Sequence, residues 1–229
     1  MNEREMQLSL NFAYNSVFQF DDLVVTESNR MAFQLIDHWP NWVFPIAVLV
    51  GKEGSGKTHF SSVWAQKADA LIIDRNEVNQ AIALASLGRS FLIEDIDAGE
   101  ISETELFHLI NSVKQANLDT RQASLLITAR TVPSAWNLKL NDLKSRFNSV
   151  MLVVINQPDD ALLTAVAFKI FSDRQIIVHP DTVYYLVSRC ERSLFSLKRV
   201  IDSVDRLALQ RKSKITRAVI AEVLNRQIQ

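Results

Sequence analysis

The stretch Gly51-Lys52-Glu53-Gly54-Ser55-Gly56-Lys57-Thr58 decides the fold of this chain. It fits the pattern G-x-x-x-x-G-K-[ST] at every fixed position, follows the apolar run 46–50 and precedes a helical pattern over 58–67. A strand, a glycine-rich turn and a helix in this order predict a phosphate-binding loop (P-loop, residues 51–58). Its backbone amides and the positive helix N-terminus would hold phosphate oxygens, while Lys57 would reach the terminal phosphates and Thr58 would face Mg²⁺.

The composition of the 229-residue chain is that of a folded globular protein, with 48% apolar and 22% charged residues. The longest apolar run, 42–50, is about half as long as a membrane span needs, and the acidic N-terminus does not look like a secretory signal. We therefore expect a cytoplasmic protein with no membrane insertion. The net charge is −1, and dense Lys and Arg occur only in the last quarter, so we expect no direct sequence-specific DNA binding.

Acidic residues close the apolar run 90–97, as in a Walker B strand. A carboxylate at such a strand tip holds Mg²⁺, and a neighbouring carboxylate orients the attacking water. Position assigns Glu94 to the metal and Asp95 to the water. The usual order is Asp followed by Asp or Glu, so the leading Glu predicts weak intrinsic ATP hydrolysis.

Three further apolar runs, 70–74, 124–128 and 150–155, alternate with helical patterns over 77–87 and 103–116. This alternation predicts an α/β fold in which helices flank a parallel sheet. Pro158 then opens an all-helical region with patterns over 159–171, 181–190, 193–210 and 216–226.

The segment 20–30, with the pattern F-D-D-L-V-V-x-x-S-N-R, resembles the start of the nucleotide-binding domain of the bacterial replication initiator DnaA and its regulatory relatives of the Hda type. Residues 35–42 look especially like the alphaproteobacterial Hda-type proteins. The resemblance implies an AAA+ fold with a flexible peptide at 1–15, a nucleotide-binding α/β domain at 16–157 and a helical lid domain at 158–229. It also implies ADP or ATP with Mg²⁺ as cofactors.

The same resemblance assigns the nucleotide contacts. The entry segment would lie against the base and ribose, the P-loop and the first turn of its helix would hold the phosphates, and Thr128 would be a sensor at the γ-phosphate. A buried Thr is also an ordinary strand residue, so both interpretations of Thr128 stay open. The expected nucleotide-contacting residues are Phe20, Asp21, Val25, Asn29, Gly51, Glu53, Gly54, Ser55, Gly56, Lys57, Thr58, His59 and Thr128.

Residues 143–147 resemble the L-x-S-R-F segment of the family, whose Arg is an arginine finger. The resemblance implies that Arg146 acts in trans, on a γ-phosphate held by a neighbouring subunit. The alternative is an ordinary exposed helix Arg. In the lid, the position of the family's sensor Arg falls on Phe195, so that the sensor is either absent or replaced by Arg192.

The N-terminal stretch 7–12 resembles the short peptide that bacterial replication proteins insert into the sliding clamp of DNA polymerase. Its amide would bond the pocket rim and its apolar side chains would fill the pocket. The residues concerned are Gln7, Leu8, Leu10 and Phe12. The alternative is an arm folded onto the protein's own surface.

Together these features predict a negative regulator of replication initiation, which binds the clamp and stimulates hydrolysis of ATP bound to DnaA. Its partners would be the clamp and DnaA, and homodimer formation is left open. A DnaA-like AAA+ adaptor in DNA remodelling or membrane-associated replication control is the main rival, and it would not bind the clamp. A self-contained P-loop kinase is a second rival, but it would need several Arg in its lid.

Overall fold

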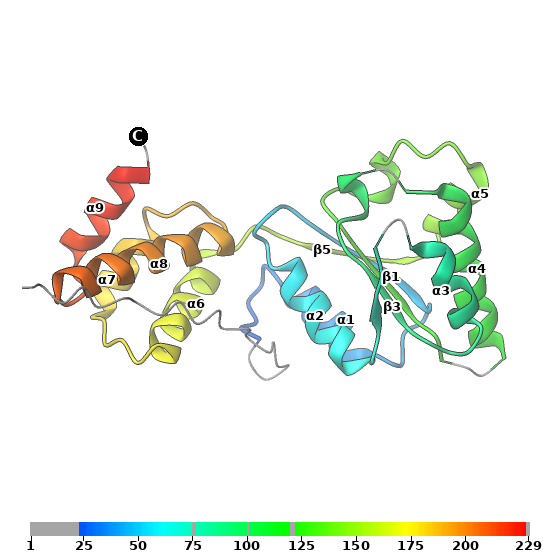
Figure 1. The fold of residues 1–229 in the computed structure, drawn as a ribbon, viewed down its shortest axis with the longest axis horizontal. Coiled ribbons are helices and arrows are strands. Elements are labelled where there is room, and N and C mark those ends of the chain that lie inside the picture. Colours follow the sequence, from blue (N-terminus) through cyan, green and yellow to red (C-terminus); the bar gives the residue numbers. More distant parts are fainter. Residues whose placement is uncertain (1–22, 75–76, 100, 120–121, 228–229) are drawn as a thin grey trace, which may run out of the picture.

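The computed structural model of the protein describes residues 23–74, 77–99, 101–119 and 122–227. A five-stranded parallel sheet lies at its centre, in the strand order β2-β3-β4-β1-β5. The strands are β1 (Ile46–Gly51), β2 (Leu71–Ile72), β3 (Phe91–Ile93), β4 (Leu125–Ala129) and β5 (Met151–Ile155). Helices flank this sheet, so the predicted α/β class is confirmed (Figure 1).

Helices cover both faces of the sheet. The helices α1 (Arg30–His38) and α2 (Lys57–Lys67) pack on one face, and α3 (Val78–Ala85), α4 (Glu103–Leu118) and α5 (Asn141–Phe147) pack on the other. Strand β1 shows the two-residue period that this requires: Val48 joins the core under α4, whereas Ala47 and Leu49 join the core under α1 and α2. All six residues of β1 are buried, because neighbouring strands lie on both sides of it and helices cover both faces.

Several elements differ from the pattern-based expectation. The run 70–74 forms only the two-residue edge strand β2, although the Ile73 amide still donates to the Leu92 carbonyl. Helix α3 is shorter than the pattern 77–87. Strand β3 stops at Ile93 because Asp95 adopts a left-handed backbone (φ 44°), after which Ile96–Ala98 form a 3₁₀ turn. A second 3₁₀ turn, Pro133–Ala135, follows β4.

The C-terminal region is all-helical, with α6 (Asp160–Asp173), α7 (Pro180–Val187), α8 (Leu194–Arg211) and α9 (Arg217–Gln227). These helices bury their own apolar core, which includes Leu163, Phe171, Leu186 and Val200. Figure 1 shows this helical region beside the end of the α/β region to which β5 leads. None of the described helices is both long and apolar enough to cross a membrane.

Candidate functional site

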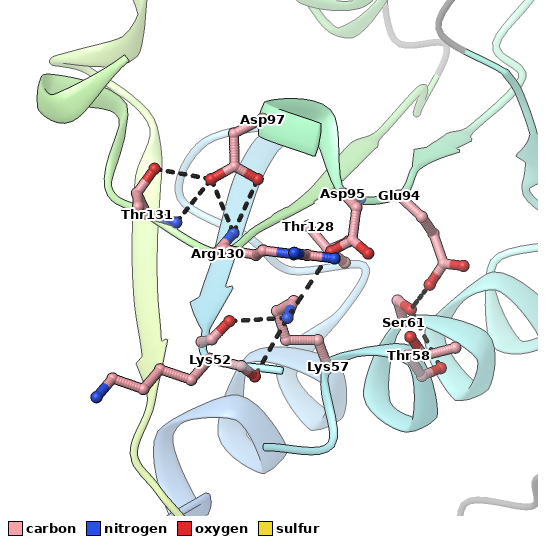
Figure 2. Close-up of polar contacts among 11 residues, drawn as sticks. Lys52, Lys57, Thr58, Ser61, Glu94, Asp95, Asp97, Thr128, Arg130 and Thr131 are labelled. Atoms are coloured by element: carbon pink, nitrogen blue, oxygen red, sulfur yellow. Dashed lines mark hydrogen bonds and ion pairs between the residues drawn. The ribbon is translucent and has the colours of Figure 1, made fainter. Parts of the chain in front are cut away.

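The P-loop joins the end of β1 to the start of α2 (Figure 2). Its turn is closed by a hydrogen bond from the Ser55 amide to the Lys52 carbonyl, at 3.2 Å. Gly56, the residue before α2, has φ 103°, a conformation that a side chain would strain. The Ser55 hydroxyl is buried and has no hydrogen-bond partner in the described part of the chain. The loop therefore connects a strand to a helix, as the sequence pattern predicts.

Lys57 lies within this loop and is only 7% exposed. Its ammonium group donates to the carbonyl oxygens of Gly51 at 2.7 Å and Lys52 at 3.4 Å, and it lies 3.8 Å from a carboxylate oxygen of Asp95. An ammonium has three donors, so two loop carbonyls fix its position and leave capacity for a phosphate oxygen.

The two acids after β3 point to different places (Figure 2). Glu94 accepts a hydrogen bond of 2.7 Å from the hydroxyl of Ser61 on α2, whereas Asp95 is turned toward Lys57. The Asp95 amide donates to the Thr128 hydroxyl at 2.8 Å, which holds Asp95 in its left-handed conformation. One oxygen of Asp95, Oδ1, is buried without a hydrogen bond in the described structure. An acceptor in this state, facing a lysine, suits a group that ligates a metal or a water molecule.

The tip of β4 is tied to the tip of β3 through Asp97. Its carboxylate accepts hydrogen bonds from the amides of Arg130 and Thr131 and from the Thr131 hydroxyl, at 2.7–3.0 Å. Partial burial raises the pKa of Asp97, but these hydrogen bonds outweigh burial, so the pKa lies below its usual value. Figure 2 shows the Arg130 side chain extending toward Asp95. Arg130 was not among the predicted site residues, although its position directly after the strand tip was a usable signal.

The arrangement fits a magnesium nucleotide. Thr58 lies exposed in the first turn of α2, where the positive helix end and the loop amides favour anionic phosphate. Glu94, which is hydrogen-bonded to Ser61, lies near Thr58, and so does the buried acceptor oxygen of Asp95. Mg²⁺ keeps several waters and takes one or two carboxylates plus substrate phosphates.

The described part of the segment 20–30 lies at the same end of the sheet as the P-loop. The amide of Asn156, just after β5, donates to the Ser28 carbonyl at 3.0 Å. Asn29 is buried and organises this segment, because its side chain accepts from the Thr26 amide and donates to the Val24 carbonyl. Val25 is 39% exposed. Of the remaining expected contacts, Glu53 is exposed, His59 is half-buried in the first turn of α2, and Phe20 and Asp21 lie outside the described residues.

Arg146 lies in the last turn of α5, just before β5 begins. The first residue of β5 pairs with Ala47 near the start of β1, and the last pairs with Gly51 at the P-loop. A five-residue parallel strand spans about 16 Å, so Arg146 and the P-loop lie at opposite ends of the sheet. The Arg146 guanidinium lies 5.9 Å from the centre of the Phe107 ring. Within the described residues it forms no ion pair.

The two positions considered for a phosphate sensor, 195 and 192, do not carry an unpaired charged side chain. Phe195, in the first turn of α8, is 56% exposed, and the guanidinium of Arg199 lies over its ring. Arg192 forms an ion pair of 3.1 Å with Asp160 of α6. The proposed clamp-binding residues Gln7, Leu8, Leu10 and Phe12 lie outside the described residues.

Comparison with family models gives no match. An uncharacterized protein of Haemophilus influenzae is 24% identical over 195 residues, which cover 79% of this chain and 82% of that protein. Domain III of the replication initiation protein DnaA from Thermotoga maritima superposes with a TM-score of 0.73 at 17% identity, covering 92% of this chain and 97% of that one.

Two larger proteins share the fold. The structure of AMPPCP-bound DnaA from Aquifex aeolicus gives a TM-score of 0.69 at 17% identity, covering 83% of this chain and 66% of that one. The RuvB Holliday junction branch migration motor of Thermotoga maritima gives 0.68 at 14% identity, covering 88% and 69%. With its P-loop, its five parallel strands and its helical C-terminal region, this chain has a DnaA-like AAA+ fold.

Proposed function

We propose that this chain is a nucleotide-binding regulator of replication initiation that binds the sliding clamp and stimulates hydrolysis of the ATP held by DnaA. The observation that carries the proposal is the position of Arg146. An arginine at the opposite end of the sheet from its own P-loop cannot reach a phosphate bound there, but it can reach a nucleotide on a neighbouring protein.

The surroundings of Arg146 suit an arginine finger. Its guanidinium lies near the face of the Phe107 ring, and a cation over an aromatic face is attracted without being neutralised. A carboxylate partner would instead compete with an incoming phosphate. The planar fork of Arg can then bond two oxygens of a transferring phosphoryl group and stabilise the charge that develops there.

The chain's own nucleotide, ADP or ATP with Mg²⁺, has a structural role in this proposal. Lys57 and Thr58 would hold its phosphates, and Asp95 with Glu94 would hold the metal and its water. Glu94 is engaged with Ser61, and the lid has Phe195 where a sensor Arg is expected, so the site is better equipped for binding than for rapid turnover. Thr128 supports the metal side of this site, because its hydroxyl fixes the backbone of Asp95.

The experiment that tests the proposal measures hydrolysis of ATP preloaded on DnaA, in the presence of clamp loaded on DNA. We expect the full chain to accelerate hydrolysis and a variant lacking residues 1–13 to lose both clamp capture and acceleration. The matched control is the same truncated variant tested for ADP binding, which should be intact. If the truncated variant still captures the clamp, or if the full chain does not accelerate hydrolysis, the DnaA-like adaptor becomes the better interpretation.

A further inference from the structure

The first residue of α8 is bonded to the P-loop. The amide of Leu194 donates to the carbonyl of Gly54 at 2.8 Å. The first amides of a helix have no acceptor within the helix itself. In α8 this acceptor comes from the loop that carries the phosphate-binding motif, so a backbone hydrogen bond joins the helical region to the nucleotide site.

Gly54 is shaped for this contact. The pattern G-x-x-x-x-G-K-[ST] does not call for glycine at this position, yet Gly54 has φ 72° and its carbonyl meets α8. A Cβ at Gly54 would lie 2.0 Å from the Ser193 hydroxyl oxygen and 3.0 Å from the Ser193 Cβ, so any side chain there would push α8 away.

Ser193 completes the contact from the helical side. It is 9% exposed, and its hydroxyl accepts from the Ser196 amide at 3.3 Å, which caps α8. The Leu194 side chain approaches Gly56, where an added Cβ would lie 3.3 Å from its Cδ1. The N-cap residue of α8 and the first residue of the helix therefore lie against two glycines of the P-loop.

We propose that Ser193 and Leu194 form a clasp on Gly54 and Gly56, and that opening of this clasp sets the rate at which nucleotide leaves the P-loop. The inference rests on the proposed nucleotide binding but not on the clamp or on DnaA. Two glycines with left-handed backbones are held in place by the clasp, and a loop held in its binding shape releases phosphate more slowly. A rigid-body movement of the helical region breaks the clasp and exposes the loop.

The clasp also explains how the lid can respond to nucleotide without a charged sensor. Phe195 carries no charge, and Arg192 is paired with Asp160. Coupling between the helical region and the site therefore runs through the loop backbone, at Gly54, rather than through a guanidinium on the phosphate.

The first experiment compares Leu194→Pro with Leu194→Ala. Proline is well tolerated as the first residue of a helix, as at Pro180 in α7, and the extended backbone of Ser193 suits a residue before proline. Both variants lose the leucine side chain, but only Leu194→Pro loses the amide that bonds Gly54. Dissociation of a fluorescent ADP analogue, chased with unlabelled ADP, should be about tenfold faster for Leu194→Pro than for Leu194→Ala. Equal rates would overturn the proposal.

The second experiment is a double-mutant cycle between Gly54→Ala and Ser193→Gly. Gly54→Ala should speed release in the wild-type background. It should have much less effect in the Ser193→Gly background, where the new methyl group has space. The strain of alanine at φ 72° is common to both backgrounds and cancels. Additive effects would contradict the clasp, and Ser102→Gly, which removes the cap of α4, is the control that should not change release.

Hydrogen exchange separates failure of the clasp from failure of nucleotide binding. In the nucleotide-free protein, the Leu194 amide should be protected, and Gly54→Ala should remove that protection. If the wild type does not bind the analogue, the proposed nucleotide function is wrong, while exchange at Leu194 still tests the clasp. Loss of protection without a change in the release rate would show that the clasp exists but does not control nucleotide exchange.

Discussion

The contacts of Lys57 make nucleotide binding testable with an internal control. Lys57 is 7% exposed, and Lys57→Ala removes an ammonium group that two loop carbonyls orient, with one donor left for a phosphate oxygen. A hydrogen bond to a charged group contributes about 1.5–3 kcal/mol, which corresponds to about a 10- to 150-fold weaker affinity for ADP when it is lost. Isothermal titration calorimetry measures this change directly.

Lys67→Ala is the matched control. Lys67 lies at the other end of the same helix, and its ammonium also donates to two backbone carbonyls, those of Ile36 and Asp37, both at 3.0 Å. Both substitutions remove a lysine that is anchored by backbone oxygens, but only Lys57 faces the loop. Lys67→Ala should therefore keep wild-type ADP affinity. Equal affinities of the Lys57→Ala protein and the wild type would refute the phosphate site, and equal losses in the two variants would refute a specific role for Lys57.

Three other outcomes follow from the site. The isolated protein should turn over ATP more slowly than about 1 per second, the lower end of typical enzyme rates, and a phosphate-release assay showing faster turnover would contradict the structural role of its nucleotide. Because the folded-state pKa of Asp97 is lowered from 3.8, its stabilisation is present above that pH and is lost as pH falls through the folded-state pKa. Asp97→Asn should therefore lower the urea midpoint at pH 7 but lower it much less once the pH has fallen through the folded-state pKa, whereas a pH-independent difference would refute this role. Phe107→Leu should reduce stimulation of DnaA while Phe107→Tyr retains it, and equal stimulation by the two variants would show that the ring does not position Arg146.

The sheet could be predicted from the sequence because its central strands are continuous apolar runs. β1, β4 and the core of β3 are buried on both faces, and burial of that kind leaves a clear pattern. The edge strand β2 was overestimated, since Ile72 is 65% exposed and only its contacts with β3 define it. The turn at Asp95 had no sequence signal, because the Thr128 hydroxyl that fixes it comes from a different strand.

The candidate site was predictable where one local motif defines it. Lys57 and Thr58 follow from the P-loop pattern, and the structure places them at the start of α2. The opposite orientations of Glu94 and Asp95 could not be read from their order, since they depend on Ser61 and Lys57 across the fold. The contact of Leu194 with Gly54 was equally hidden, because it joins backbone atoms of distant segments.

In the proposed function Arg146 acts on the ATP of a partner, and single-turnover hydrolysis of ATP preloaded on DnaA tests this role most directly. The reaction contains DNA-loaded clamp and the wild type, Arg146→Ala or Lys144→Ala, the last being an exposed cation on the same helix. Arginine fingers contribute about 10³- to 10⁵-fold in rate with little ground-state affinity, so Arg146→Ala should abolish stimulation of hydrolysis. Lys144→Ala should stimulate hydrolysis as the wild type does, and both variants should capture the clamp as the wild type does. Stimulation by Arg146→Ala equal to that of the wild type would contradict the claim.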